Sequence, residues 1–201
     1  MVPIGAVQIS CNLVRLADIT PLPWKNGGGY TRELLAWPDA VDWDLRISVA
    51  EIHKSGPFSI FPGVDRWIAV LSGAGISLET ADLETQHLNT AQLSLHAFSG
   101  ETPTQCTTLG TVTQDFNVMW RRTRGRLQQH ALRGLPQIDT TAALVALFVV
   151  LPVTVTAATN ETWLLPALSL AWWLNPRRER RVLRAQTEHL HVRGWWMEAV
   201  S

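Results

Sequence analysis

Cysteine, lysine and charged side chains in general are scarce in this chain of 201 residues. The two cysteines, Cys11 and Cys106, are too few for the disulfide framework of a small secreted protein, so we expect a reducing, cytoplasmic location. Seventeen basic and 17 acidic residues cancel, and together they make up only 17% of the chain. This balance excludes a disordered tail, and it excludes a nucleic-acid-binding protein that works through bulk charge.

Long uncharged segments are also scarce, and the one that raises the question of a membrane helix spans residues 142–158, AALVALFVVLPVTVTAA. It is shorter than the roughly 20 apolar residues that a membrane-spanning helix needs. Its content of Val, Phe and Thr, with Pro152 near the middle, favours two buried strands separated by a break. The first ten residues, MVPIGAVQIS, lack the features of a signal peptide, so we expect no membrane partner.

Tryptophan and arginine are the residues in excess. There are ten tryptophans against one tyrosine, and 15 arginines against Lys25 and Lys54. The planar guanidinium group matches a carboxylate, so this usage fits recognition of planar anions, although a GC-rich genome explains the total more simply. Residues 1–120 carry 6 basic and 12 acidic side chains, and residues 121–201 carry 11 and 5. The two parts of the chain therefore have opposite net charge.

Short apolar runs that end at Gly, Pro, Asn or Asp dominate the sequence, and long amphipathic helical patterns are scarce. Residues 43–49 alternate between an apolar face and a polar face that carries Asp44, Arg46 and Ser48. Residues 65–78, with a turn-like segment at 72–75, predict a hairpin. Many short strands with Gly and Pro turns predict an all-β barrel or sandwich. Further strands are expected at residues 116–120, 144–150, 153–156 and 163–174, the last broken at Pro166.

Two weaker patterns concern the second half of the chain. The predicted hairpin near residue 73 has a counterpart around residues 144–174, which hints at two similar halves without a residue-level repeat. The segment 177–184, RRERRVLR, is typical of a helix or an exposed basic strand. A solvated surface segment is its simplest interpretation.

The most unusual stretch is residues 23–33, PWKNGGGYTRE, in which three consecutive glycines let the backbone turn and approach a neighbour closely. It matches no P-loop, because the lysine precedes the glycines, and no dinucleotide-binding fingerprint, because the strand-to-helix context is missing. The glycines of an esterase oxyanion loop would need a Gly-x-Ser-x-Gly elbow, which the chain lacks. We interpret the stretch as a rigid turn that presents Lys25, Asn26 and Arg32 near one another.

Two further stretches are dense in turn residues or polar residues. Residues 56–66 contain two Pro, two Gly and two Phe, a pattern typical of an ordered loop anchored in the core. In residues 115–122, period-2 alternation separates the apolar side chains from a second face that carries Asp115, Asn117, Met119 and Arg121. This second face points either into the lumen of a barrel or to solvent, and both interpretations stay open.

Metal-ligand patterns are weak in this sequence. His189 and His191 are the only histidines at ligand spacing, and Glu198 follows seven residues on, farther than a metal-binding barrel would place it. We interpret both histidines as surface or core residues, and we expect no metal and no cofactor. No hydrolase triad can be assembled from visible motifs. The other histidines and both cysteines lack partners at ligand spacing: His53, His87, His96, His130, Cys11 and Cys106.

Taken together, these stretches resemble the HutD/Ves family. The matching segments follow the family's order: PWKNGGGYTREL (23–34), residues 43–75, FSGE (98–101) and DFNVMWRR (115–122). The resemblance covers about the first two thirds of the chain. It implies a cupin-type double-stranded β-barrel, a jelly roll of the RmlC type, with two cupin-like halves in one chain (a bicupin). It also implies a bacterial protein without the usual cupin metal ligands, which restrains or tunes histidine utilisation by sensing an intermediate.

The resemblance carries the motif residues onto this chain position by position. We expect residues 1–125 to form an N-terminal cupin-like half with these motifs. Residues 126–201, which carry no recognised motif, would complete the second half, and the whole would pack as one compact unit. The motif residues are Trp24, Lys25, Asn26, Gly27, Gly28, Gly29, Thr31 and Glu33 in the first stretch, Arg46, Ser48, Glu51, Gly56, Pro57, Phe58, Ser59, Phe61, Pro62, Gly63, Asp65 and Arg66 in the second, and Asp115, Asn117, Met119, Arg121 and Arg122 in the third.

The first functional hypothesis is a small-molecule sensor. Histidine degradation runs through urocanate and N-substituted glutamates such as formylglutamate, which are all carboxylates. An anion held in a barrel mouth needs a forked cationic donor, neutral hydrogen-bond donors and apolar walls. We predict the ligand-binding residues to be Trp24, Lys25, Asn26, Arg46, Ser48, Phe61 and Arg66, with Trp67 as a further apolar wall.

Two alternatives belong to other classes of protein. The chain would be a metal-independent isomerase or hydrolase if Glu33, Glu51 or Asp65 acted as general acid or base, although structural ion pairs with Arg46 and Arg66 are the simpler interpretation. It would be a protein-interaction module, with a homodimer expected, if its tryptophans were exposed. Adjacent tryptophans on a strand point to opposite faces, so one of each pair should lie outside. The candidates are Trp172, Trp173, Trp195 and Trp196.

Overall fold

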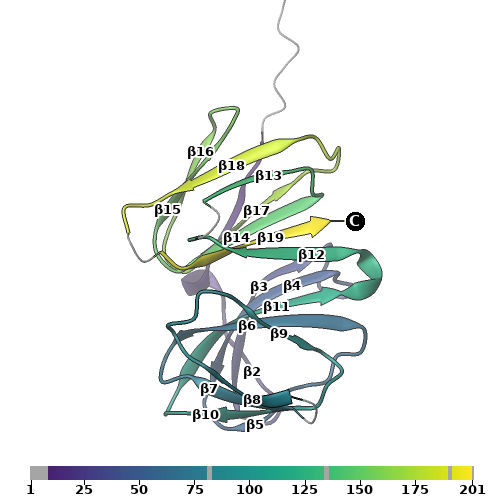
Figure 1. Cartoon of the computed structure of the whole chain (residues 1–201), viewed down its shortest axis with the longest axis vertical. Coiled ribbons are helices and arrows are strands. Elements are labelled where there is room, and N and C mark those ends of the chain that lie inside the picture. The colour runs from purple at the N-terminus through teal and green to yellow at the C-terminus, as the bar shows by residue number, and fades with distance from the viewer. Residues whose placement is uncertain (1–8, 81–82, 134–135, 190–191, 201) are drawn as a thin grey trace, which may run out of the picture. The chain divides into compact units, whose positions relative to one another are not determined.

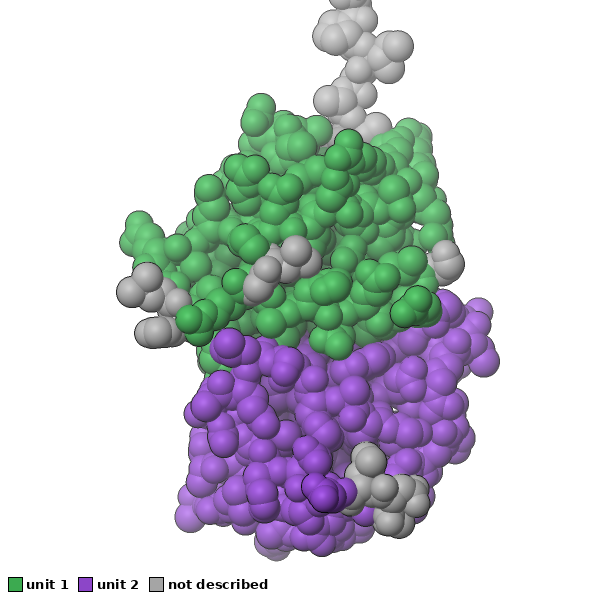
Figure 2. All heavy atoms as spheres, in the orientation of Figure 1, with its two compact units in different colours: residues 1–15, 126–201 green, residues 16–125 purple. Residues whose placement is uncertain are grey.

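The computed structural model describes residues 9–80, 83–133, 136–189 and 192–200, which are almost entirely β-structure (Figure 1). These residues form nineteen strands and two short 3-10 helices, η1 (Leu16–Asp18) and η2 (Arg122–Arg124). They divide into two compact units, coloured separately in Figure 2. The all-β prediction is therefore confirmed.

The N-terminal unit, residues 16–125, consists of two antiparallel sheets. The six-stranded sheet has the order β2 (Leu22–Pro23), β3 (Gly29–Trp37), β4 (Leu45–Ile52), β11 (Thr113–Arg121), β6 (Val64–Ser72) and β9 (His96–Ser99). The four-stranded sheet has the order β5 (Gly56–Pro57), β10 (Thr104–Thr108), β7 (Ile76–Thr80) and β8 (Leu83–Leu88).

The C-terminal unit combines residues 9–15 with the described residues after 125. Its five-stranded sheet has the order β1 (Asn12–Arg15), β17 (Ser169–Leu174), β14 (Leu144–Val149), β19 (Gly194–Val200) and β12 (Arg126–Ala131). Its four-stranded sheet has the order β13 (Gln137–Thr140), β18 (Arg181–Gln186), β15 (Val153–Ala157) and β16 (Thr162–Leu165). Residues 12–15 belong to this unit because β1 pairs with β17.

The two units repeat one strand order. The series β4-β11-β6-β9 of the N-terminal unit corresponds to β12-β19-β14-β17 of the C-terminal unit. The series β5-β10-β7-β8 corresponds in the same way to β13-β18-β15-β16. Each strand from β4 to β11 is thus matched by the strand eight places later in the chain. The similarity of the two halves lies in their topology.

Side chains from both sheets of a unit meet in its apolar core, as expected for two sheets packed face to face. The core of the N-terminal unit contains Ile52, Ile68, Val70 and Phe98 from the six-stranded sheet and Ile76, Leu78, Leu88 and Cys106 from the four-stranded sheet. The core of the C-terminal unit is built around Val145, Leu147, Trp173 and Trp196 from the five-stranded sheet and Val153, Val155, Leu165 and Leu183 from the four-stranded sheet.

The apolar segment 142–158 forms β14 and β15, with Pro152 in the break between them, as predicted. No helix within the described ranges is both long and apolar enough to cross a membrane. Residues 163–174 likewise form β16 and β17 around the break at Pro166. The basic segment 177–184 is not a helix, because its second half is the start of β18.

The predicted hairpin at residues 65–78 is wrong. β6 pairs with β11 and β9 in one sheet, whereas β7 pairs with β10 and β8 in the other. The turn between them therefore passes the chain from sheet to sheet. Gly73 and Gly75 have φ angles of 93° and 106°, which side chains rarely adopt, so glycine suits this corner as well as it suits a hairpin.

The prediction that one tryptophan of each adjacent pair lies outside is also wrong. Trp173, Trp195 and Trp196 are fully buried, and Trp172 is partly buried. Alternation along the strand holds, but both faces of these strands are buried at these positions. Trp173 packs against Trp196 with ring centroids 6.2 Å apart, and Trp195 stacks on Phe148 at 6.3 Å. The homodimer stays a prediction without support from exposed tryptophans.

Candidate functional site

A cavity of about 530 Å³ lies in the N-terminal unit, within the size range of small-molecule sites. We call it the N-terminal cavity. Side chains from β3, β4, β6 and β11 line it, together with the turn before β3 and the loop after β5. All seven residues predicted to bind a ligand are brought together here: Trp24, Lys25, Asn26, Arg46, Ser48, Phe61 and Arg66.

Hydrogen bonds close the turn before β3, for which the glycine-rich sequence predicts a rigid turn. The Gly27 amide donates to the Trp24 carbonyl (3.0 Å), and the Trp24 amide donates to the Gly29 carbonyl (2.9 Å). The Asn26 side-chain oxygen accepts from the Gly28 amide at 2.9 Å. These bonds leave Lys25 and Asn26 exposed at the edge of the cavity.

Close approach explains one of the three glycines directly. A Cβ atom at Gly29 would overlap the carbonyl oxygen of Glu51 on β4, so only glycine fits this position. The Trp24 indole is fixed by a hydrogen bond from Nε1 to Thr31 Oγ1 at 2.7 Å. Arg32 does not line the cavity: it follows the lining residue Thr31 on β3, so alternation directs it to the opposite face, and it forms an ion pair with Glu51.

Strand register arranges the cavity lining in three rows across β4, β11 and β6. Met119 of β11 lies between Arg46 and Arg66, which form the cationic row. Asn117 pairs with Ser48 in the polar row. Asp115 pairs with Ala50 and Val70 in the acidic row. The cationic and acidic rows lie four residues apart along β11, a separation of about 13 Å at ~3.3 Å per residue.

Arg66 is the most buried cation of this lining, with 6% of its surface exposed. Its guanidinium carbon lies 4.6, 5.2 and 5.5 Å from the ring centroids of Phe98, Phe58 and Phe61. Nη1 donates to the Ser59 carbonyl at 3.3 Å, whereas buried Nε has no hydrogen-bond partner among the described residues. Burial lowers the pKa of Arg66 to about 10, the Asp115 charge opposes this, and the Arg46 charge adds to it. Arg66 is therefore cationic at neutral pH.

Trp67 is not an apolar wall of the cavity. It follows Arg66 on β6, so alternation directs it to the opposite face of the strand, and it is not among the lining residues. Phe58 takes that role together with Phe61, because both belong to the loop after β5.

Asp115 and Asn117 also line the cavity, and neither is among the residues predicted to bind a ligand. Asp115 is 1% exposed; Asn117 Nδ2 donates to its Oδ1, and its Oδ2 has no partner among the described residues. Burial raises the pKa of Asp115 to about 7, against the opposing effects of the Asn117 hydrogen bond, the Arg66 charge and the Ala50 amide. The sequence left open whether this face of the strand points into a barrel or to solvent, and Asp115, Asn117 and Met119 line the cavity. The period-2 alternation in residues 115–121 was the sequence feature that grouped them on one face.

The three carboxylates considered as acid or base do not line the cavity. Each accepts from an arginine, as in the ion-pair interpretation, but Arg66 is not one of these partners among the described residues. Arg122 is the partner that sequence reasoning missed. The pairs are Glu33 with Arg46 (2.6 Å), Glu51 with Arg32, and Asp65 with Arg122 (2.7 Å).

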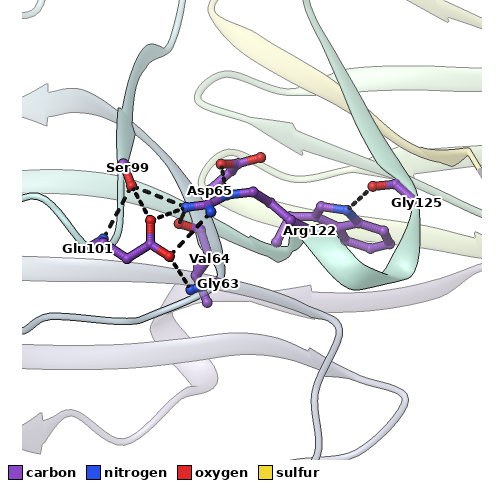
Figure 3. Close-up of polar contacts among 8 residues, drawn as sticks. Gly63, Val64, Asp65, Ser99, Glu101, Arg122 and Gly125 are labelled. Atoms are coloured by element: carbon purple, nitrogen blue, oxygen red, sulfur yellow. Dashed lines mark hydrogen bonds and ion pairs between the residues drawn. The ribbon is translucent and has the colours of Figure 1, made fainter.

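Arg122 is the centre of a polar network at the surface (Figure 3). It donates from Nε to Asp65 (2.7 Å) and from Nη2 to Glu101 (2.7 Å) and to the Ser99 hydroxyl (3.1 Å). Glu101 also accepts from the Gly63 amide at 2.7 Å. The Arg122 hydrogen bonds, then the Gly63 amide and the Ser99 hydroxyl, lower the pKa of Glu101 to about 2. Glu101 therefore stays ionised over the whole neutral range.

This network holds the loop that carries Phe58, Ser59 and Phe61 into the cavity. The loop ends at Gly63, which Glu101 binds, and the Phe61 amide donates to the Gly100 carbonyl at 2.7 Å. Several family motif residues thus support the cavity from outside instead of lining it.

We expect Glu101→Ala to loosen this loop. The Gly63 amide and the Arg122 guanidinium would lose their acceptor, so the amides of residues 58–63 should exchange with solvent at least several-fold faster. Hydrogen exchange measured by mass spectrometry checks this. Glu79→Ala, at an exposed position on β7, is the control. Equal exchange in the two variants would contradict the role given to Glu101.

Histidines and cysteines form no group of three potential metal ligands with each other or with carboxylates in the part of the chain that the structure describes. His189 is exposed, and His191 lies outside the described residues. His130 Nε2 lies 3.7 Å from Glu198 Oε1, and Cys106 belongs to the apolar core.

The fold and the cavity define an all-β protein of two topologically equivalent units, with a polar and aromatic cavity in the first of them. The chain belongs to the HutD family, whose model matches residues 16–191. It is 36% identical over 140 residues to an uncharacterized 21.2 kDa protein in the hutC 3′ region of Pseudomonas putida, covering 68% of this chain and 72% of that protein. It is 38% identical over 112 residues to protein Ves of Citrobacter koseri, covering 53% and 58%.

Solved structures also show similarity to a HutD protein. A conserved protein of unknown function from Pseudomonas aeruginosa superposes with a TM-score of 0.80 at 28% identity, covering 94% of this chain and 98% of that one. HutD from Pseudomonas fluorescens gives a TM-score of 0.77 at 26% identity, covering 94% and 97%. Two cupin-like proteins share the fold alone: Escherichia coli YlbA (TM-score 0.65, 9% identity) and Bacillus subtilis oxalate decarboxylase (0.55, 8%).

Proposed function

We propose that this protein is a metal-free bicupin that binds a small carboxylate in the N-terminal cavity and thereby tunes histidine utilisation in the cytoplasm. The observation that carries the proposal is the pair of arginines in the cationic row. Arg46 and Arg66 face one cavity from β4 and β6, and the Arg46 charge lowers the pKa of Arg66. An anion between them relieves this repulsion and accepts from both guanidinium groups.

The bicupin interpretation draws on the repeated strand order and on the fold shared with cupin-like proteins. The link to histidine utilisation draws on names. One relative is described by its position beside hutC, and one solved structure is named HutD. Urocanate and formylglutamate, the carboxylates of that pathway, are the ligands to test first.

We expect Arg66→Met to weaken the binding of such an acid at least about thirtyfold, because truncating one partner of a buried charged pair costs about 2 kcal/mol or more. Methionine keeps an unbranched side chain between the three phenylalanines. Arg46→Met should also weaken binding, by less, because Arg46 is more exposed and already paired with Glu33. Isothermal calorimetry with urocanate and formylglutamate measures both.

Arg121→Met is the matched control for these variants. Arg121 stacks over Trp43 at 5.3 Å and does not line the cavity, so its loss should leave the affinity unchanged. Unchanged affinity in both the Arg46 and Arg66 variants would show that the acid does not bind at the proposed site. If none of these acids raises the melting temperature of the wild type, carboxylates of this pathway are not its ligands.

One observation favours the alternative, a metal-independent isomerase or hydrolase. A buried carboxyl group whose pKa lies near 7 suits general acid–base chemistry, and Asp115 lies in the cavity. Prolonged incubation of the purified protein with urocanate or formylglutamate, followed by chromatography, tests this. Consumption of either acid that disappears in Asp115→Asn would establish the enzyme.

A further inference from the structure

Two buried groups of opposite charge share the N-terminal cavity without forming an ion pair. Asp115 and Arg66 are 1% and 6% exposed, and both line the cavity. No ion pair within 4.0 Å joins them, because their rows lie four residues apart along β11. Separated charges of this kind are costly in a protein interior unless a third group connects them.

Each of the two groups keeps one buried polar atom without a partner in the described part of the chain. Asn117 donates to one oxygen of Asp115, which leaves Oδ2 as an acceptor. Arg66 donates to the Ser59 carbonyl through Nη1, which leaves Nε as a donor. Native structures satisfy most buried polar groups, so an unpaired acceptor and an unpaired donor on two residues that line one cavity require an explanation.

The neighbours of Asp115 leave room for a ligand at the acidic row. It is flanked across the sheet by Ala50, a small side chain that lines the cavity, and by Val70 of the apolar core. Neither supplies a hydrogen-bond donor from its side chain; the Ala50 backbone amide lowers the pKa of Asp115, and Oδ2 is the oxygen without a partner among the described residues. The polar row with Ser48 and Asn117 lies between Asp115 and the two arginines. The lining side chains of β4, β11 and β6 are therefore cationic at one end, acidic at the other and neutral between.

We infer that Asp115 is a specificity-determining residue that accepts a hydrogen bond from an N–H group of the ligand, so the cavity selects organic acids that also carry a donating nitrogen. This inference rests on the proposed carboxylate binding. The carboxylate of the ligand lies at Arg46 and Arg66, and its amide or ring N–H lies at Asp115.

The ionisation of Asp115 predicts the direction in which ligand affinity changes with pH. Asp115 accepts from the ligand in its ionised form, so affinity for an N–H-bearing acid should rise as the pH passes upward through about 7. Arg66 lowers the pKa of Asp115 and stays charged in this range. The other ionisable groups around the site are Lys25, Arg46 with its partner Glu33 and, on β10, Cys106, whose thiol has a pKa raised to about 12 by burial and by Asp115. On β9, His96 stacks on Phe98 at 6.2 Å, and burial lowers its pKa, which moves its titration away from pH 7.

The test uses pairs of ligands that differ only by N–H against oxygen. Formylglutamate is compared with its ester analogue O-formyl-2-hydroxyglutarate, and urocanate with 3-(1,3-oxazol-4-yl)acrylate, by calorimetry at pH 6 and pH 8. The wild type should bind the N–H member at least about tenfold more tightly at pH 8, since a hydrogen bond to a charged group contributes about 1.5 kcal/mol or more. Asp115→Asn should lose this preference, because its amide NH2 takes the place of Oδ2.

The outcomes separate the two proposals. If the wild type binds no acid of either pair, the proposed function fails. If it binds both members of each pair equally, or if affinity falls as the pH rises through 7, carboxylate binding stands and the role of Asp115 is overturned, even where the variant is not available in folded form. Asp139→Asn, at an exposed carboxylate paired with Arg180 in the C-terminal unit, is the control that should keep the preference.

Discussion

Replacing Asp115 by Asn is expected to stabilise the protein by up to about 4 kcal/mol at pH 8 and to have little effect at pH 4. Burial raises the pKa of Asp115 from 3.8 to about 7, so the folded protein must ionise a carboxyl group that the unfolded chain ionises far more readily. For a raised carboxyl pKa, the stability contribution is complete below the unfolded-state pKa near 3.8 and is lost as the pH rises through about 7. The isosteric amide removes this penalty.

Urea denaturation of the wild type and Asp115→Asn at pH 4, 6 and 8 measures the difference. Comparing the two proteins at each pH removes acid effects that they share, such as protonation of Glu101, whose pKa lies at about 2. Asp139→Asn serves as the control with the opposite sign, because Arg180 lowers the pKa of Asp139. A difference between wild type and Asp115→Asn that does not change with pH would contradict the buried titration.

Trp173→Ala is expected to lower the free energy of unfolding by about 3–5 kcal/mol, the range found when a buried large aromatic side chain is truncated. Trp173 of β17 is fully buried in the core of the C-terminal unit. Its ring lies edge-on to Trp163 with centroids 5.5 Å apart and tilted to Trp196 at 6.2 Å. Alanine would leave a cavity between these two indoles.

Two other variants calibrate this loss. Trp173→Phe should cost much less, because phenylalanine fills most of the space and removes an indole N–H that has no acceptor among the described residues. Trp172→Ala, at the partly buried neighbour, should also cost less. Chemical denaturation of the three variants ranks their losses in the free energy of unfolding. Equal losses for Trp172→Ala and Trp173→Ala would show that Trp173 does not hold this core together.

The two units share a strand order but differ in the chemistry of equivalent strands. On β11, Asp115, Asn117 and Met119 face the N-terminal cavity. On the equivalent strand β19, Trp196 enters the apolar core. The C-terminal unit therefore uses its tryptophans for packing, whereas the N-terminal unit places polar side chains of the equivalent strand in a cavity.

Local sequence determined most of the strands and indicated part of the cavity lining. The alternation in residues 43–49 placed Arg46 and Ser48 on one face, and the glycines of residues 27–29 predicted the rigid turn that carries Trp24. These features depend on a period of two residues and on the backbone freedom of glycine, which act over a few residues. They can therefore be recognised without knowing how the chain folds.

Only the tertiary structure decided which strands pair and what covers each face. A turn rich in glycine connects β6 and β7 across two sheets, the tryptophans of β17 and β19 are buried, and Asp65 pairs with Arg122, 57 residues away. The pKa of Asp115 depends in the same way on side chains from neighbouring strands. Pairing, burial and electrostatic environment come from contacts between residues distant in sequence, so no local pattern determines them.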